Sequence, residues 1–114
     1  MDIRDLRNIK KHIFFCNGEA CSLNGTAEVT KAIRKEIKKQ SLHGCIHTTK
    51  TLCNSRCHDA AIVIVYPTNE WYKNMQPSDA EEFVKEVIIN DKPFHKILYK
   101  QGDDKIYSES TITV

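Results

Sequence analysis

The chain has 114 residues and a net charge of +2 at pH 7, which excludes a large multidomain enzyme and argues against a nucleic-acid-binding protein. One domain spanning residues 1–114 fits this length, and a core of this size forms without disulfide bonds. The N-terminal residues alternate charged and apolar side chains, and no run is long enough to cross a membrane. We therefore expect a soluble cytoplasmic protein with no membrane partner.

The first half of the chain predicts a strand, a helix and a second strand. Residues 12–15 form a short apolar run typical of a buried strand. Residues 26–40 have the apolar spacing of a helix, with Thr26 as its expected N-cap. Residues 44–51 alternate loosely and carry threonines, which favours a strand. The predicted helix presents one apolar stripe and one basic face: Val29, Ile33 and Ile37 against Lys31, Arg34, Lys35, Lys38 and Lys39.

The second half predicts a strand hairpin and another helix. Residues 61–66 are a continuous β-branched run, and residues 70–73 form the returning strand after a turn in which Asn69 tolerates positive φ. Ser78 and Glu81 have the spacing of a capping box at the start of the second helix. Its apolar stripe consists of Ala80, Phe83, Val84, Val87 and Ile88.

The C-terminal segment, residues 94–114, is less regular. ILYK and KIYS flank QGDD as in a hairpin, but polar residues interrupt the pattern, so this segment is also compatible with a loosely attached arm. The whole order is β-α-β followed by β-β-α. It predicts an α/β protein with a thioredoxin-like fold, a mixed sheet of about four strands flanked by helices.

Four of the five cysteines fall in two pairs, each after a predicted strand. Cys16 and Cys21 have the spacing C-x4-C, and Cys53 and Cys57 have the spacing C-x3-C. In a β-α-β unit the two strands run parallel, so both pairs are expected at one edge of the sheet. Four thiolates are the ligand set of a 2Fe-2S cluster or a structural zinc, and these wide spacings favour the cluster. They also argue against a C-x-x-C dithiol.

A cluster of net negative charge needs hydrogen-bond donors around its sulfur atoms. The predicted donors are the backbone amides around Asn17, Gly18 and Asn54 and the side chains of Asn54, Ser55 and Arg56. Arg56 can also offset the charge of an added electron or meet an acidic partner. The alternative is a solvated loop cation.

Other residues have two interpretations each. Cys45 is expected to be a buried or half-buried strand residue, and the rival role is a spare ligand. His58 is expected to be a neighbour of the cluster, because a Rieske-type site needs two histidines. Trp71 and Tyr72 either face a partner or dimer mate or pack in the core, and strand alternation allows one of them to point in and the other out. The basic helix face is either solvated or a docking surface for an acidic redox partner.

Three stretches resemble a known family: CSLNGTAEV from position 21, TLCNSRCHDA from position 51 and IVIVYPTNEWY from position 62. Together they look like the thioredoxin-like 2Fe-2S ferredoxins, small bacterial proteins similar to the thioredoxin-fold subunit of respiratory complex I. The resemblance covers about residues 10–90. Two positions depart from the family pattern, since Leu52 and Asn69 stand where glycine is common.

The resemblance implies one 2Fe-2S cluster held by Cys16, Cys21, Cys53 and Cys57. It further implies a homodimeric one-electron carrier, and not an enzyme, that serves an unidentified oxidoreductase. Two alternatives stay open. One is a scaffold, accessory or sensor module in which the same thiolates hold zinc or a cluster, and the other is a thiol-disulfide redox protein.

Overall fold

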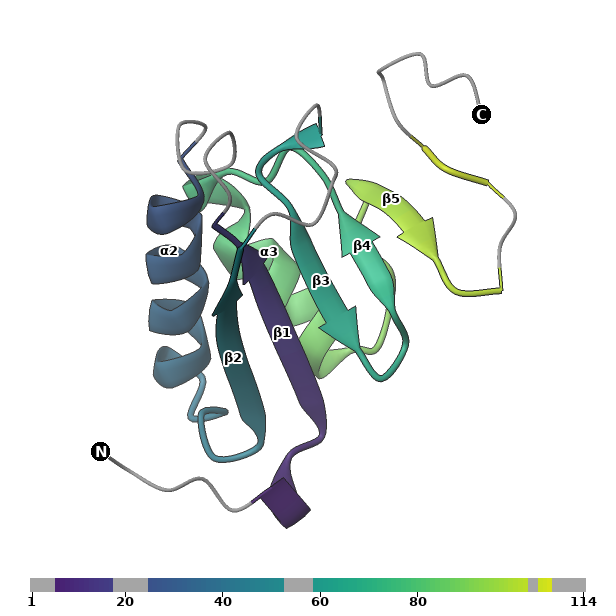
Figure 1. Cartoon of the computed structure of the whole chain (residues 1–114). Helices are drawn as coiled ribbons and strands as arrows, with labels where there is room; N and C mark the ends of the chain where they lie inside the picture. The colour runs from purple at the N-terminus through teal and green to yellow at the C-terminus, as the bar shows by residue number, and fades with distance from the viewer. Residues whose placement is uncertain (1–5, 18–24, 53–58, 103–104, 108–114) are drawn as a thin grey trace.

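The computed structural model describes residues 6–17, 25–52, 59–102 and 105–107. The chain begins with a 3-10 turn and then follows the predicted order of strands and helices, with one strand added at the end (Figure 1). The elements are η1 (Leu6–Asn8), β1 (Lys11–Cys16), α2 (Thr26–Lys39), β2 (Ile46–Thr51), β3 (Val63–Tyr66), β4 (Glu70–Tyr72), η3 (Pro77–Asp79), α3 (Ala80–Phe83), η4 (Val84–Ile89) and β5 (Ile97–Lys100).

The strands form one mixed sheet in the order β2-β1-β3-β4-β5. β1 and β2 are parallel, and every other neighbouring pair is antiparallel. The predicted α/β class and mixed sheet are confirmed, but the sheet has five strands and not about four. The extra strand is the ILYK segment, which pairs with β4. The predicted contact with KIYS is present as one backbone hydrogen bond, from the Tyr107 amide to the Leu98 carbonyl oxygen over 2.7 Å, and it forms no further strand among the described residues.

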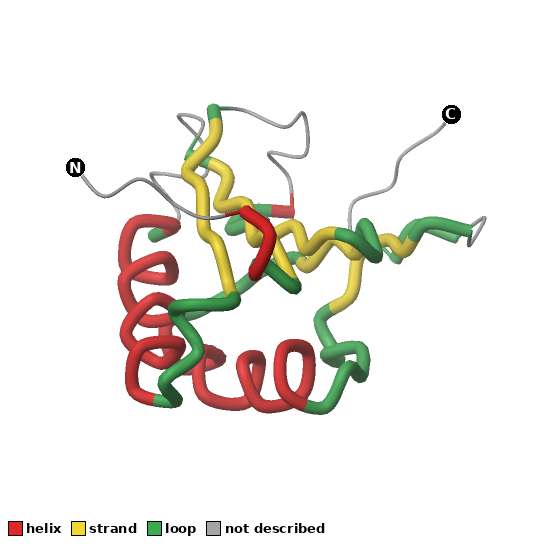
Figure 2. Tube along the Cα trace, turned by 90° about the horizontal axis from the view of Figure 1, so that it is seen from below, coloured by secondary structure: helices red, strands yellow, loops and turns green. Residues whose placement is uncertain are grey.

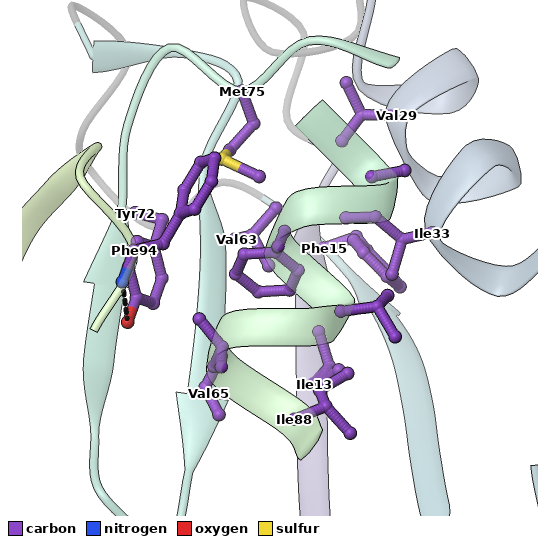
Figure 3. Close-up of a cluster of buried hydrophobic side chains, with 14 of the residues drawn as sticks. Ile13, Phe15, Val29, Ile33, Val63, Val65, Tyr72, Met75, Ile88 and Phe94 are labelled. Carbon is purple, nitrogen blue, oxygen red and sulfur yellow. Dashed lines mark hydrogen bonds between the residues drawn. The ribbon is translucent and has the colours of Figure 1, made fainter. Parts of the chain in front are cut away.

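Both helical segments pack on the same face of the sheet (Figure 2). Val29 and Ile33 of α2 meet Ile13 and Phe15 of β1 in a core that Figure 3 shows in close-up. This core follows from the predicted stripes, because each helix buries the apolar side that its spacing defined. Of the two interpretations left open for Trp71 and Tyr72, core packing holds for Tyr72, which is buried, whereas the neighbouring Trp71 is half-buried on the other face.

The helix starts differ from the prediction. Gly25, with φ of 85°, is the N-cap of α2, and Thr26 is already its first helical residue. Glycine adopts this left-handed conformation without the steric cost that a Cβ would add. The predicted Ser78–Glu81 box is replaced by one at the 3-10 turn η3, where the backbone amide of Gln76 donates to Asp79 Oδ2 over 2.8 Å, and α3 itself begins at Ala80. After α3 the chain continues as the π-helical segment η4.

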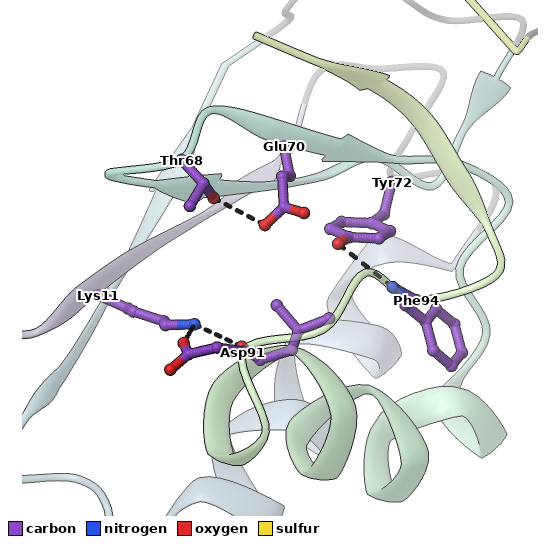
Figure 4. Close-up of polar contacts among 7 residues, drawn as sticks. Lys11, Thr68, Glu70, Tyr72, Asp91 and Phe94 are labelled. Carbon is purple, nitrogen blue, oxygen red and sulfur yellow. Dashed lines mark hydrogen bonds and ion pairs between the residues drawn. The ribbon is translucent and has the colours of Figure 1, made fainter. Parts of the chain in front are cut away.

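The start of the C-terminal segment belongs to the core. Phe94 is buried, and its backbone amide donates to the hydroxyl of Tyr72 over 3.4 Å (Figure 4). Leu98 of β5 is buried as well. Residues 94–100 are therefore no loose arm, and the described residues 105–107 form no strand. The helices in the described part of the chain are too short or too polar to cross a membrane.

The turn between β3 and β4 confirms the role predicted for Asn69. This residue has φ of 54°, which asparagine tolerates better than most residues. Its side-chain carbonyl accepts a hydrogen bond from the indole nitrogen of Trp71 over 2.7 Å, and its backbone carbonyl accepts one from Gln101 over 3.3 Å. Asn69 thus joins the turn to the end of β5.

Candidate metal centre

Cys16 is the last residue of β1, and its side chain is almost completely buried, with 2% exposed. It lies on the sheet face that the helices leave open, in a small apolar cluster with Ile62, Ile64 and Leu98. β1 delivers it there because alternate residues of a strand point to one face. Burial among apolar side chains keeps water away from the sulfur atom.

The ends of β1 and β2 meet at the same edge of the sheet. Cys16 is the Cα partner of Thr51, and the Asn17 amide donates to the Thr51 carbonyl oxygen over 2.8 Å. The Cys16 sulfur lies 3.5 Å from the carbonyl oxygen of Leu52, the residue directly before Cys53. The predicted parallel arrangement is confirmed, and it brings the first cysteine to the starting point of the second cysteine-bearing segment.

The other predicted ligands and their neighbours lie outside the described residues. They are Cys21, Cys53, Cys57, Asn54, Ser55, Arg56, Gly18 and His58. Within the described ranges, no three His, Cys, Asp or Glu side chains come close enough to hold a metal ion. This follows from the position of the predicted ligands in the chain, since of the four only Cys16 is described.

The structure corrects one prediction, that the backbone amide of Asn17 donates a hydrogen bond to a cluster sulfur atom. The backbone amide of Asn17 already donates to the Thr51 carbonyl, so it continues the ladder between β1 and β2. The Asn17 side-chain amide donates to the Phe15 carbonyl over 3.1 Å. Asn17 therefore acts as a clamp that closes the strand pair at this edge.

Cys45 lies at the opposite end of β2 from the metal centre. It is half-buried in the turn before the strand, and its thiol donates to the Leu42 carbonyl oxygen over 3.4 Å. Thr51 lies six positions further along the chain, which is about 20 Å along an extended strand. The expected packing role is confirmed in burial, although Cys45 precedes the strand, and this distance argues against a spare ligand.

A group of aromatic rings on the open face was not predicted. His12 stacks on Phe14 with ring centroids 4.0 Å apart and meets the edge of His47 at 4.6 Å. Its Nε2 atom lies 2.6 Å from Thr49 Oγ1. Burial, and secondarily the neighbouring His47, lower the pKa of His12. This group could be found only with the register of the parallel strands, which pairs His12 with His47.

Leu52 marks the rim of the centre. Its side chain is 83% exposed, although its carbonyl oxygen faces Cys16. The family departure at this position therefore places an apolar side chain in solvent next to Cys53.

This geometry agrees with the comparisons to known proteins. The family model for the thioredoxin-like [2Fe-2S] ferredoxin matches residues 4–88. The chain belongs to this family. A protein of Priestia megaterium is 37% identical over 101 residues, which cover 89% of this chain and 79% of that protein. The 2Fe-2S ferredoxin of Clostridium pasteurianum is 32% identical over 93 residues, covering 73% and 89% respectively.

The same ferredoxin fold occurs in a solved structure. The thioredoxin-like [2Fe-2S] ferredoxin of Aquifex aeolicus superposes with a TM-score of 0.76 at 25% identity, covering 87% of this chain and 99% of that one. The predicted resemblance and the thioredoxin-like fold are thus confirmed. The cofactor of this ferredoxin family is a 2Fe-2S cluster, and its members are electron carriers.

The described residues fit such a cluster. A buried thiol stands at the end of β1, and the strand that leads to the second cysteine pair ends beside it. Thiolates are the ligands that iron–sulfur clusters use. The adjoining ends of β1 and β2 are therefore the candidate metal centre of this ferredoxin.

Proposed function

We propose that this ferredoxin binds one 2Fe-2S cluster through Cys16, Cys21, Cys53 and Cys57 and passes single electrons to or from an oxidoreductase. The observation that supports it is the meeting of Cys16 with Leu52 at the ends of two parallel strands. When bound, the cluster supplies one-electron chemistry, with iron alternating between the ferric and ferrous states. The protein makes and breaks no bonds of a substrate and is not an enzyme.

The residues of the chain would act by ligation, by shielding and by hydrogen bonding. Cys16 would ligate from within the apolar cluster of Ile62, Ile64 and Leu98, where exclusion of water strengthens every electrostatic effect on the metal. Asn54, Ser55 and Arg56 are proposed as donors that offset the negative charge of the sulfur atoms. Their role rests on their position between two ligands in the sequence.

The wider setting is part of the same proposal. We propose that residues 1–114 act as one domain, in the cytoplasm and as a homodimer. The half-buried Trp71 and Tyr99 on the open face of the sheet are aromatic residues of the kind that interfaces favour. Sedimentation of the purified holoprotein at twice the mass of the chain would support the homodimer, and the mass of a single chain would contradict it.

The function is tested by metal analysis of protein purified without oxygen. One cluster predicts about two irons and two acid-labile sulfides per chain, a reddish-brown colour and bleaching by dithionite. A colourless protein with stoichiometric zinc would support a scaffold role instead. A metal-free protein with a disulfide that dithiothreitol reduces would support thiol-disulfide chemistry. Either result contradicts the electron-carrier proposal.

A further inference from the structure

A groove with an excess of positive charge runs between α2 and the edge strand β2. Its lining, here called the basic groove, consists of Ala27, Glu28, Thr30, Lys31, Arg34 and Lys50. Figure 1 shows α2 beside β2, the outermost strand on that side of the sheet. The cations thus come from two consecutive elements, Lys31 and Arg34 from α2 and Lys50 from β2.

Arg34 is held in place at the centre of the basic groove. Its Nε donates to Thr48 Oγ1 of β2 over 2.9 Å, and its guanidinium carbon lies 5.9 Å from the centroid of the Phe15 ring. Stacking and hydrogen bonding restrict a side chain that otherwise loses much rotamer freedom on binding. The groove therefore offers one cation that is already ordered for an incoming carboxylate.

The positive charge of the basic groove is not neutralised from within. Lys31, Arg34 and Lys50 are exposed, and none of them forms an ion pair with a described residue. Glu28 is the only carboxylate in the lining. Further exposed cations extend the same helix: Lys35, Lys38 and Lys39. An acidic surface gains attraction here without first displacing an internal partner.

The basic groove lies directly beside the metal centre. Lys50 is the Cα partner of Phe15, and the next pair along the two strands is Cys16 with Thr51. Arg34 lies over the ring of the same Phe15. A partner docked in the groove would therefore lie against the edge from which electrons leave.

We propose that the basic groove is the docking surface for an acidic face of the protein that exchanges electrons with this ferredoxin. This inference rests on the proposed function and adds the chemistry of the partner to it. A protein partner is favoured over nucleic acid, because no aromatic side chain lines the groove for base stacking and the net charge is only +2. Electrostatic docking also gives the fast, salt-sensitive encounter that electron carriers need.

The test compares two triple variants with the same change in charge. K31E/R34E/K50E reverses the basic groove, whereas K85E/K92E/K100E reverses three exposed lysines that do not line it. The probe is a purified flavodoxin, an acidic one-electron carrier, and NMR amide shifts of the holoprotein at low salt report its binding. We expect the groove variant to weaken binding about tenfold or more and the control less than about twofold.

Several results would overturn the proposal. The first is that flavodoxin does not bind. The second is that its binding does not depend on salt, and the third is that both variants weaken its binding equally. Tighter binding of a short single-stranded oligonucleotide would assign the groove to nucleic acid. A change in sedimentation mass confined to the groove variant would assign it to contacts between copies of the chain.

A second measurement reports the electrostatic potential beside the proposed metal centre. Ferricyanide, an anion, and hexaamminecobalt(III), a cation, each accept one electron from the reduced protein without forming a bond to it. The groove variant should slow oxidation by ferricyanide and accelerate oxidation by hexaamminecobalt(III), each about tenfold at low salt, with little change in the control. Unchanged rates would overturn the proposal. Loss of the proposed function appears separately, as absent iron and sulfide in the unmodified protein.

Discussion

The Cys16 sulfur and the Leu52 carbonyl oxygen lie 3.5 Å apart, which joins the ends of two strands that are separated by more than thirty residues in the sequence. This contact is a consequence of the parallel pairing of β1 with β2. A helix must connect parallel strands that neighbour one another, and α2 is that connection. The candidate metal centre thus depends on the β-α-β unit as a whole.

Replacing Cys16 by serine should remove or destabilise the cluster. A hydroxyl is a poorer iron ligand than a thiolate, so iron and sulfide should fall well below the values of the unmodified protein. Visible absorption and iron analysis after anaerobic purification measure the loss. Cys45→Ser is the matched control, because Cys45 lies at the other end of β2. Bleaching by the control alone would contradict the ligand assignment.

Replacing Phe94 by alanine should cost about 3–5 kcal/mol of the free energy of unfolding, as for other buried aromatic residues. Phe94 packs against Tyr72 and Phe83 with ring centroids 6.3 Å and 5.8 Å apart. Urea denaturation followed by circular dichroism measures the change. Ile89→Ala serves as control, since this side chain is 49% exposed and should matter little. Equal stability of the two variants would mean that the segment before β5 is not part of the core.

Replacing Gly25 by alanine should destabilise the protein by about 1 kcal/mol through backbone strain alone. The residue has φ of 85°, and an added Cβ would find its nearest neighbour, Glu28 Oε2, at 3.7 Å, an ordinary contact distance. Gly44→Ala is the control, because its Cβ would meet nothing within 4 Å. Denaturation midpoints of the two variants decide between strain and crowding, and a Gly25 variant as stable as the control would contradict the strain.

The stability of the protein should decrease as the pH falls below 6.5, the ordinary pKa of histidine, through the lowered pKa of His12. A lowered pKa means that the folded state binds fewer protons than the unfolded state near this pH. The contribution of His12 to the free energy of unfolding is therefore present above pH 6.5 and is lost as the pH falls through its lowered pKa. His12→Gln should flatten the difference in urea midpoint between pH 7 and pH 5. His43→Gln, at an exposed position, should leave it unchanged. The same slope in both variants would exclude His12 as its source.

The elements that the sequence predicts correctly are those in which the pattern of apolar residues itself shows which face is buried. The stripe of α2 and the β-branched run of β3 are such cases, because local spacing determines which face is covered. The meeting of the ends of β1 and β2 was also predictable, since it follows from a general property of parallel strands.

The features that sequence reasoning missed depend on contacts between distant residues. β5 becomes a strand because β4 offers it an edge, and residues 97–100 alone do not show that. The use of the Asn17 amide by Thr51 and the position of Arg34 over Phe15 depend on register. Residue type and spacing carry no information on register at these positions. The cap at Gly25 was missed because Thr26 is itself a good capping residue.

The clamp formed by Asn17 and Thr51 has a consequence for protein engineering. The hydrogen bonds between β1 and β2 continue up to these two residues, and α2 begins at Thr26, directly after its N-cap Gly25. The described strands and α2 thus stay in contact with one another up to the residues that border the two cysteine-bearing segments. We expect that loops of other lengths or charges, placed between Asn17 and Gly25 or after Leu52, would vary the reduction potential while the described sheet and helices keep their arrangement.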